Sequence, residues 1–253
     1  TFIMTNGDII NINISGTLEQ TDHVPPDDDL FVFQNLIKEV IIGSAVTGLG
    51  DRAFESCQEM QSVTIPDSVT SIGEFAFIQC RSLQSVIIPN SVTSIGANAF
   101  RTCLELQSVT IPDSVTSIPS YAFRDCRALQ SVTIPDSVTS IGNSGFASCR
   151  ALLSVTIPDS VTSIGSSAFA GCHALQTVTI GDSVTSIGVN AFIYCNVLAT
   201  AYMSETVRNS LGLSFGENQT FYGKEGVTII DLNLLTNEPE PEAEHEPEPE
   251  DEY

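Results

Sequence analysis

The chain has 253 residues, of which 31 are acidic and 9 are basic, and its formal net charge is −22. This length allows one elongated domain or two ordinary domains. The acidic balance argues against nucleic acid as a partner, because phosphate binding needs a basic surface. No stretch has the length and hydrophobicity of a membrane span, so we expect no insertion into a membrane.

Residues 1–36 are the least regular part of the chain and are predicted to cap one end of the fold. The pair Asn6-Gly7 lies between apolar stretches and is typical of a hairpin turn. Phe31 lies 23 residues before Phe54, which indicates a degraded first repeat. A cap is expected because an open end of a repeat protein would expose its core and a strand edge.

Residues 37–203 repeat with a period of 23 residues. All seven cysteines follow this step: Cys57, Cys80, Cys103, Cys126, Cys149, Cys172 and Cys195. A phenylalanine three residues before each cysteine does the same: Phe54, Phe77, Phe100, Phe123, Phe146, Phe169 and Phe192. A fixed period of this size is typical of stacked-repeat proteins. We therefore predict a repeat solenoid of seven copies and a partial eighth.

Each copy contains one short segment of alternating apolar residues, such as Val132 and Ile134, which predicts a strand. One such strand cannot bury a face alone, but strands stacked about 4.8 Å apart share one interior. The phenylalanines are expected to form a column of rings, and the cysteines a column of reduced, buried thiols. A redox or metal column is the weaker alternative, because no histidine repeats with the cysteines.

Proline and glycine mark two corners of the repeat. Pro135 follows its strand and cannot donate to a ladder, so it ends the strand. Gly142, seven residues later, is expected to adopt an unusual backbone angle. Pro119 replaces this glycine in the fourth copy. Because proline cannot adopt a positive φ, either that corner differs or the glycines are not left-handed.

The pattern LxxVxIPxxVxxIGxxAFxxC resembles the BspA-like, or Treponema-type, leucine-rich repeat family over about residues 37–203. Departures are few: Gly43 and Gly181 replace the proline, Gly145 the alanine and Leu49 the isoleucine. The resemblance implies a solenoid with a parallel β-sheet on one face and short helical or irregular turns on the other. It also implies binding or adhesion, and a location at the cell surface or outside the cell.

Residues 204–236 are predicted to cap the other end. Ser204 precedes residues 205–211, which are predicted to form a short helix capped by this serine. The aromatic-Gly motif at residues 221–223 and the apolar residues 227–230 read as a closing strand.

Residues 237–253 alternate glutamate with proline and contain nine acids without a lysine or arginine. Charge repulsion and proline predict a disordered tail. It is interpreted as a spacer or, less favoured, as an interaction or calcium-collecting segment.

The search for catalytic chemistry finds one weak candidate. Gly212, Ser214 and Gly216 fit the nucleophile-elbow pattern, which needs a strand-to-helix turn and a positioned histidine. Here the motif follows a predicted helix, and the chain has three histidines: His23, His173 and His245. Three adjacent acids at residues 27–29 are expected to form a solvated loop. We predict no enzyme activity, no cofactor and no metal site.

Function is therefore expected on exposed surfaces. The strand neighbours of Val132, namely Ser131 and Thr133, should point outward and form two hydroxyl columns along the stack. The candidate binding residues on this face are Thr64, Thr110, Thr133, Thr156 and Thr179, with Asp113 and Asp136 beside them. The columns predict contact with another regular surface, such as glycan, mineral or ice. The favoured interpretation is that duplication of the repeat alone explains their uniformity.

The opposite side varies between copies and holds most of the arginines. The candidate binding residues there are Arg101, Tyr121, Arg124, Arg127 and Arg150. Arginine and tyrosine are common anchors of protein interfaces, so one interpretation of this side is a specific protein site. The favoured interpretation is a solvated face under loose constraint.

These observations predict a non-catalytic, monomeric leucine-rich-repeat module that recognises a protein or glycan through its extended surface. The alternative is a structural or adhesive cell-surface component whose Ser/Thr array contacts a repetitive surface.

Overall fold

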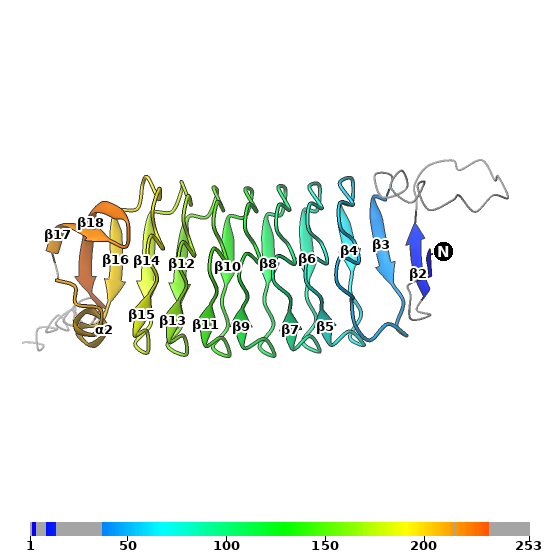
Figure 1. Cartoon of the computed structure of the whole chain (residues 1–253), viewed down its shortest axis with the longest axis horizontal. Coiled ribbons are helices and arrows are strands. Elements are labelled where there is room, and N and C mark those ends of the chain that lie inside the picture. Colours follow the sequence, from blue (N-terminus) through cyan, green and yellow to red (C-terminus); the bar gives the residue numbers. More distant parts are fainter. Residues whose placement is uncertain (1, 4–8, 14–36, 215, 233–253) are drawn as a thin grey trace, which may run out of the picture.

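The computed structural model describes residues 2–3, 9–13, 37–214 and 216–232, and the repeats form an elongated stack of parallel turns (Figure 1). Each turn contributes one strand to the front of the stack. These strands are β3 (Glu39–Ile42), β4 (Ser62–Thr64), β6 (Ser85–Ile87), β8 (Ser108–Thr110), β10 (Ser131–Thr133), β12 (Ser154–Ile157), β14 (Thr177–Ile180) and β16 (Thr200–Met203). Equivalent residues pair in register, as Val109 does with Val132. The predicted solenoid is confirmed.

Each turn from β4 to β14 also contributes a short strand after the proline corner. These strands form a second parallel ladder along the stack, which the sequence did not predict. Its strands are β5 (Ser71–Ile72), β7 (Ser94–Ile95), β9 (Ser117–Ile118), β11 (Ser140–Ile141), β13 (Ser163–Ile164) and β15 (Ser186–Ile187). These strands also pair in register, so Ser140 lies between Ser117 and Ser163.

The third side of each described repeat is an irregular turn and not a helix. The N–H of Tyr121 donates to the carbonyl of Asn143 (2.9 Å), and that of Phe123 donates to Gly145 (2.8 Å). Tyr121 and Asp125 both have a φ of 62°. Two left-handed residues in one turn cannot continue a right-handed helix, so of the two possibilities the resemblance implied, the irregular turn is found.

The interior is a single core in which the phenylalanine rings form the predicted column. Phe123 is fully buried and stacks on Phe100 and Phe146, with ring centroids 5.4 and 5.3 Å apart. All seven cysteines are free and buried, as predicted. The Cys126 thiol donates to the carbonyl of Phe100 in the previous turn (3.2 Å), and burial raises the pKa of the Cys57 thiol to about 12.

The prediction of an unusual backbone angle at the corner glycines is wrong. Gly142 has no positive φ. Glycine is required at this position because two backbones approach closely. A Cβ there would lie 2.5 Å from the backbone nitrogen of Ser120 in the preceding turn. Pro119 occupies the same corner and lacks the N–H with which Gly142 bonds to Ile118. The second ladder is interrupted at this point, between β7 and β9.

Further strands extend both ends of the stack, and each end includes an antiparallel pair. At the N-terminal end, β2 (Ile9–Asn13) pairs with β3, and β1 (Phe2–Ile3) pairs with β2. The predicted turn at Asn6-Gly7 and the degraded repeat around Phe31 lie outside the described residues.

At the C-terminal end, the predicted helix is present as α2 (Glu205–Ser210), whose N-cap Ser204 accepts a hydrogen bond from the N–H of Val207 (3.4 Å). β18 (Lys224–Asp231) pairs with β16 and with β17 (Gly216–Phe221), which places Phe221 at the end of the ring column, 5.0 Å from Phe192. The acidic residues 237–253 lie outside the described part of the chain.

Candidate binding surfaces

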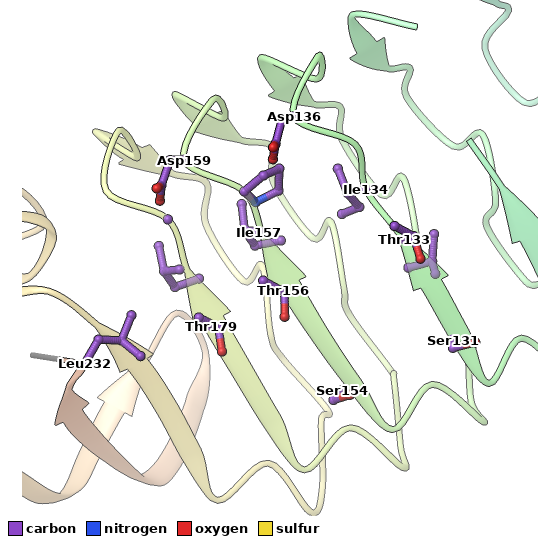
Figure 2. A pocket seen from close by; sticks show the side chains of 14 residues that line it. Ser131, Thr133, Ile134, Asp136, Ser154, Thr156, Ile157, Asp159, Thr179 and Leu232 are labelled. Atoms are coloured by element: carbon purple, nitrogen blue, oxygen red, sulfur yellow. The ribbon is translucent and has the colours of Figure 1, made fainter. Parts of the chain in front are cut away.

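The front strands present two rows of outward hydroxyl side chains, which we call the hydroxyl face. Alternation along each strand buries residues such as Val155 and turns Ser154 and Thr156 to solvent. The face consists of Ser62, Thr64, Ser85, Ser108, Thr110, Ser131, Thr133, Ser154, Thr156, Thr177 and Thr179. All of these side chains are exposed or half-buried, and Figure 2 shows the central ones projecting from the same side of the sheet. The five predicted threonines are therefore brought together.

The hydroxyl groups of this face make no hydrogen bond within the described part of the chain. Other repeated hydroxyls are used internally. The Ser137 Oγ donates to the carbonyl of Val115 (2.7 Å), and the Thr139 Oγ1 donates to that of Thr116 (3.1 Å). The hydroxyl face therefore keeps its full hydrogen-bonding capacity for solvent or a partner, and second-ladder serines such as Ser140 and Ser163 also make no hydrogen bond among the described residues.

A depression of about 500 Å³ lies on this face over β10, β12 and β14 (Figure 2). It coincides with an interruption of the front sheet, since β10 and β12 belong to separate sheets. Val132 is only half-buried there, whereas Val109 and Val155 are buried. Residues 131–136 and 154–159 have the same sequence, and nothing in the structure explains why pairing stops between them.

The row of acids beside the hydroxyl face is also exposed. Asp113 and Asp136 face solvent, and the Asp159 carboxylate accepts a hydrogen bond from the N–H of Asp182 (2.8 Å). Asp136 and Asp159 line the depression (Figure 2). The edge of the hydroxyl face is therefore negatively charged.

The five predicted arginine-side residues lie on the irregular turns. The Arg124 guanidinium lies 5.7 Å from the centroid of the Tyr121 ring. Asp125 is 3.4 Å from Arg124 and 3.9 Å from Arg127, and Arg101 donates to Asn98 (3.3 Å). Arg150 is exposed in the turn next to that of Arg127. This surface differs from the hydroxyl face in its charge and its variability.

Exposed apolar side chains were the weakest part of the sequence prediction. Val189, Tyr194 and Val197 are 72%, 67% and 50% exposed, and all three lie on the turn side of the last full repeat. Tyr194 could be expected there from its place beside a cysteine. The period also gave a sign for the two valines, because Val189 and Val197 occupy positions at which other copies carry Asn143 and Glu105.

The remaining chemical motifs do not assemble into a site. Ser214 lies between α2 and β17, so the order is helix and then strand, opposite to that of a nucleophile elbow. His173 is exposed on a turn. Within the described ranges, no cluster of three or more His, Cys, Asp or Glu residues could hold a metal ion. No helix in those ranges is both long and apolar enough to cross a bilayer.

A family model described as a BspA type leucine rich repeat region (6 copies) matches residues 27–130 and 116–232. The chain belongs to the BspA type leucine-rich repeat family. No curated protein matches this family member in sequence.

Three solved structures are similar to this BspA type chain. The leucine-rich repeat protein of T. pallidum is 28% identical, with a TM-score of 0.49, over 69% of this chain and 87% of that one. A Bacteroides ovatus leucine-rich repeat protein is 26% identical, with a TM-score of 0.45, over 67% of this chain and 56% of that one. A leucine rich cell surface protein of Faecalibacterium prausnitzii is 30% identical, with a TM-score of 0.40, over 74% of this chain and 66% of that one. The chain thus spans little more than half the length of the Bacteroides protein.

Proposed function

We propose that this protein is a non-catalytic binding module that recognises a glycan through its hydroxyl face. One observation carries the proposal: within the described part of the chain the hydroxyls of this face have no partner and stand in two rows beside a depression, whereas those of Ser137 and Thr139 bond adjacent turns. Unused donors and acceptors on one rigid surface match a ligand that is itself rich in hydroxyl groups.

A glycan suits the centre of this face better than a protein does. Protein interfaces depend on buried aromatic and arginine anchors, and Thr110, Thr133 and Thr156 offer hydroxyls and methyl groups instead. The depression beside Thr156 gives this face, in which the exposed Ile87 replaces one threonine, a place where a sugar ring could be oriented. We place the protein at the cell surface or outside the cell, as the family resemblance implies.

The decisive variant is T110V/T133V/T156V, which removes three hydroxyls but keeps the β-branched shape of each side chain. Each lost hydrogen bond contributes about 0.5–1.5 kcal/mol, so we expect glycan affinity to fall by roughly tenfold or more. Binding is measured on an array of cell-wall and host glycans and then by calorimetry on the glycan selected. The matched control is R124Q/R127Q, which alters the opposite side and should leave glycan affinity unchanged.

A second triple variant, T110K/T133K/T156K, places three long charged side chains across the same face and should abolish binding. Glycan binding that survives these lysines would refute the proposal, provided that the thermal melt shows a folded chain.

The in-register pairing of the strands favours a second candidate, an adhesive component that meets a repetitive surface. Such an array would act through avidity, because each contact is weak and many are made together. It predicts retention on an immobilised polymer but no measurable affinity for a soluble oligosaccharide. A binding module predicts saturable binding of the oligosaccharide itself.

A further inference from the structure

Four arginines on three consecutive turns form a surface of local positive charge, which we call the arginine face: Arg101, Arg124, Arg127 and Arg150. The turn segments that carry them, residues 97–105, 120–128 and 143–151, contain two acids, Glu105 and Asp125. The whole chain has a net charge of −22, so this concentration of arginine stands out from its surroundings.

Backbone bonds hold these turns side by side. The N–H of Thr102 donates to the carbonyl of Arg124 (2.8 Å), and the N–H of Ala151 donates to that of Arg127 (3.1 Å). Adjacent turns in such ladders are about 4.8 Å apart, so the guanidinium groups can act on one ligand.

Acidic neighbours offset this charge only in part. The Asp125 carboxylate forms ion pairs with two arginines: its Oδ2 lies 3.4 Å from Arg124 Nε, and its Oδ1 lies 3.9 Å from Arg127 Nη2. Within the described part of the chain Arg150 forms no ion pair, and the partner of Arg101 is the neutral side chain of Asn98. The face therefore retains positive charge for an external carboxylate.

We propose that the arginine face docks the acidic tail of this same chain, residues 237–253. The tail contains nine acids and no lysine or arginine, so its charge is complementary to this face. The hydroxyl face is the less favourable place for it, because exposed carboxylates such as Asp113 and Asp136 border that side and would repel it. The proposal uses a different surface from the glycan proposal and does not depend on it.

The tail is long enough to reach this face. β18 ends at Asp231, four strand positions along the stack from β10, whose repeat contains Arg150. Four spacings amount to about 19 Å along the axis. The 21 residues after Leu232 extend to about 70 Å when fully stretched, which also allows the chain to pass around the side of the solenoid.

Tethering makes the tail an internal competitor for the arginine face. Because the tail belongs to the same chain, its effective concentration at the face is on the order of millimolar, so weak ion pairs suffice for occupancy. A partner with acidic segments would have to displace the tail before it could bind there.

The test is a titration of full-length protein with a labelled synthetic peptide of residues 237–253, followed by fluorescence anisotropy at low salt. A tail-neutral variant has glutamine at eight positions: Glu238, Glu240, Glu242, Glu244, Glu246, Glu248, Glu250 and Glu252. We expect this variant to bind the peptide roughly fivefold more tightly than the wild type, because its own tail no longer competes. Binding should be lost at about 0.5 M salt, where exposed charges are screened.

The arginine requirement is tested in the tail-neutral chain with R127Q/R150Q, which changes two exposed side chains. The matched control R52Q/R81Q removes the same charge from turns outside the arginine face. We expect R127Q/R150Q to weaken peptide binding roughly fivefold or more and the control to have little effect. Equal peptide affinity of the wild-type and tail-neutral chains would overturn the assignment of the tail as occupant. Equal effects of the two arginine pairs would overturn the assignment of the face.

Discussion

Gly165 offers a direct test of how closely the turns approach one another. A Cβ at this position would lie 2.6 Å from the backbone nitrogen of Asn143 and from the carbonyl carbon of Gly142, both in the preceding turn. Ordinary contact begins at about 3.4 Å, so Gly165→Ala forces the two backbones apart by about 0.8 Å. Movement of the Asn143 side chain, whose Oδ1 would lie 2.8 Å away, cannot relieve this contact, because the two closest opposing atoms belong to the main chain.

The expected cost follows from the bonds that this shift disturbs. The N–H of Gly165 donates to the carbonyl of Ile141 (2.7 Å), and the N–H of Ser166 donates to the Asn143 side chain (2.8 Å). Two weakened hydrogen bonds cost about 1–3 kcal/mol, and overpacking adds about 1–3 kcal/mol. Alanine also lowers the conformational entropy of the unfolded chain, which stabilises the folded state by about 0.4–1 kcal/mol. We expect Gly165→Ala to lower the free energy of unfolding by about 3 kcal/mol, within a range of about 1–6 kcal/mol.

Gly171→Ala is the matched control in the same repeat. Gly171 has a φ of +73°, but a Cβ there would be 3.5 Å from its nearest neighbour. Asp125 and Ser148 hold the same left-handed position in other turns, so alanine should cost only about 1 kcal/mol. Urea unfolding of both variants measures the difference, and hydrogen exchange at the Gly165 amide reports the local opening. Equal destabilisation by the two substitutions would refute the close-approach explanation.

Three further predictions concern the core, the thiols and the interrupted ladder. Phe123→Ala should lower the free energy of unfolding by about 3–5 kcal/mol and Phe123→Leu by less than about 1.5 kcal/mol, measured by urea denaturation; an unchanged midpoint for the alanine variant would contradict burial of the ring. Burial raises the pKa of Cys57 from 9.0 to about 12, so its neutral form contributes fully below pH 9.0 and its contribution is lost as pH rises towards 12. Unfolding free energy should therefore fall between about pH 9 and about pH 12, by up to about 1.4 kcal/mol per pH unit for each such thiol, and a flat profile would show that the thiols are accessible. Pro119→Gly restores a missing N–H donor worth about 1 kcal/mol but frees the unfolded chain at a cost of about 1 kcal/mol, so we expect little net change in stability and a newly protected amide at that residue in hydrogen exchange.

The interior could be predicted from the sequence because repetition removes the usual ambiguity. A residue such as Phe123 must contact the same residue of the turns before and after it, so one period places the whole ring column. The thiol column and the outward direction of Thr133 follow in the same way. A local pattern cannot show how the two arginine-bearing positions of one turn share Asp125, because that depends on the turn's irregular backbone.

The conformation of the corner glycines shows where such reasoning ends. Glycine suggested a left-handed angle at Gly142, but the left-handed residues are Tyr121, Asp125 and their equivalents, and glycine is required where two backbones nearly touch. The distance between turns is set by all the ladders together, and no single repeat encodes it. That distance also decides which hydroxyls bond to a neighbouring turn and which remain free on the hydroxyl face. By itself the chain determined its period, its buried residues and the side of each strand that faces water, whereas the tertiary structure alone decided how close the turns lie and which polar groups they leave unused.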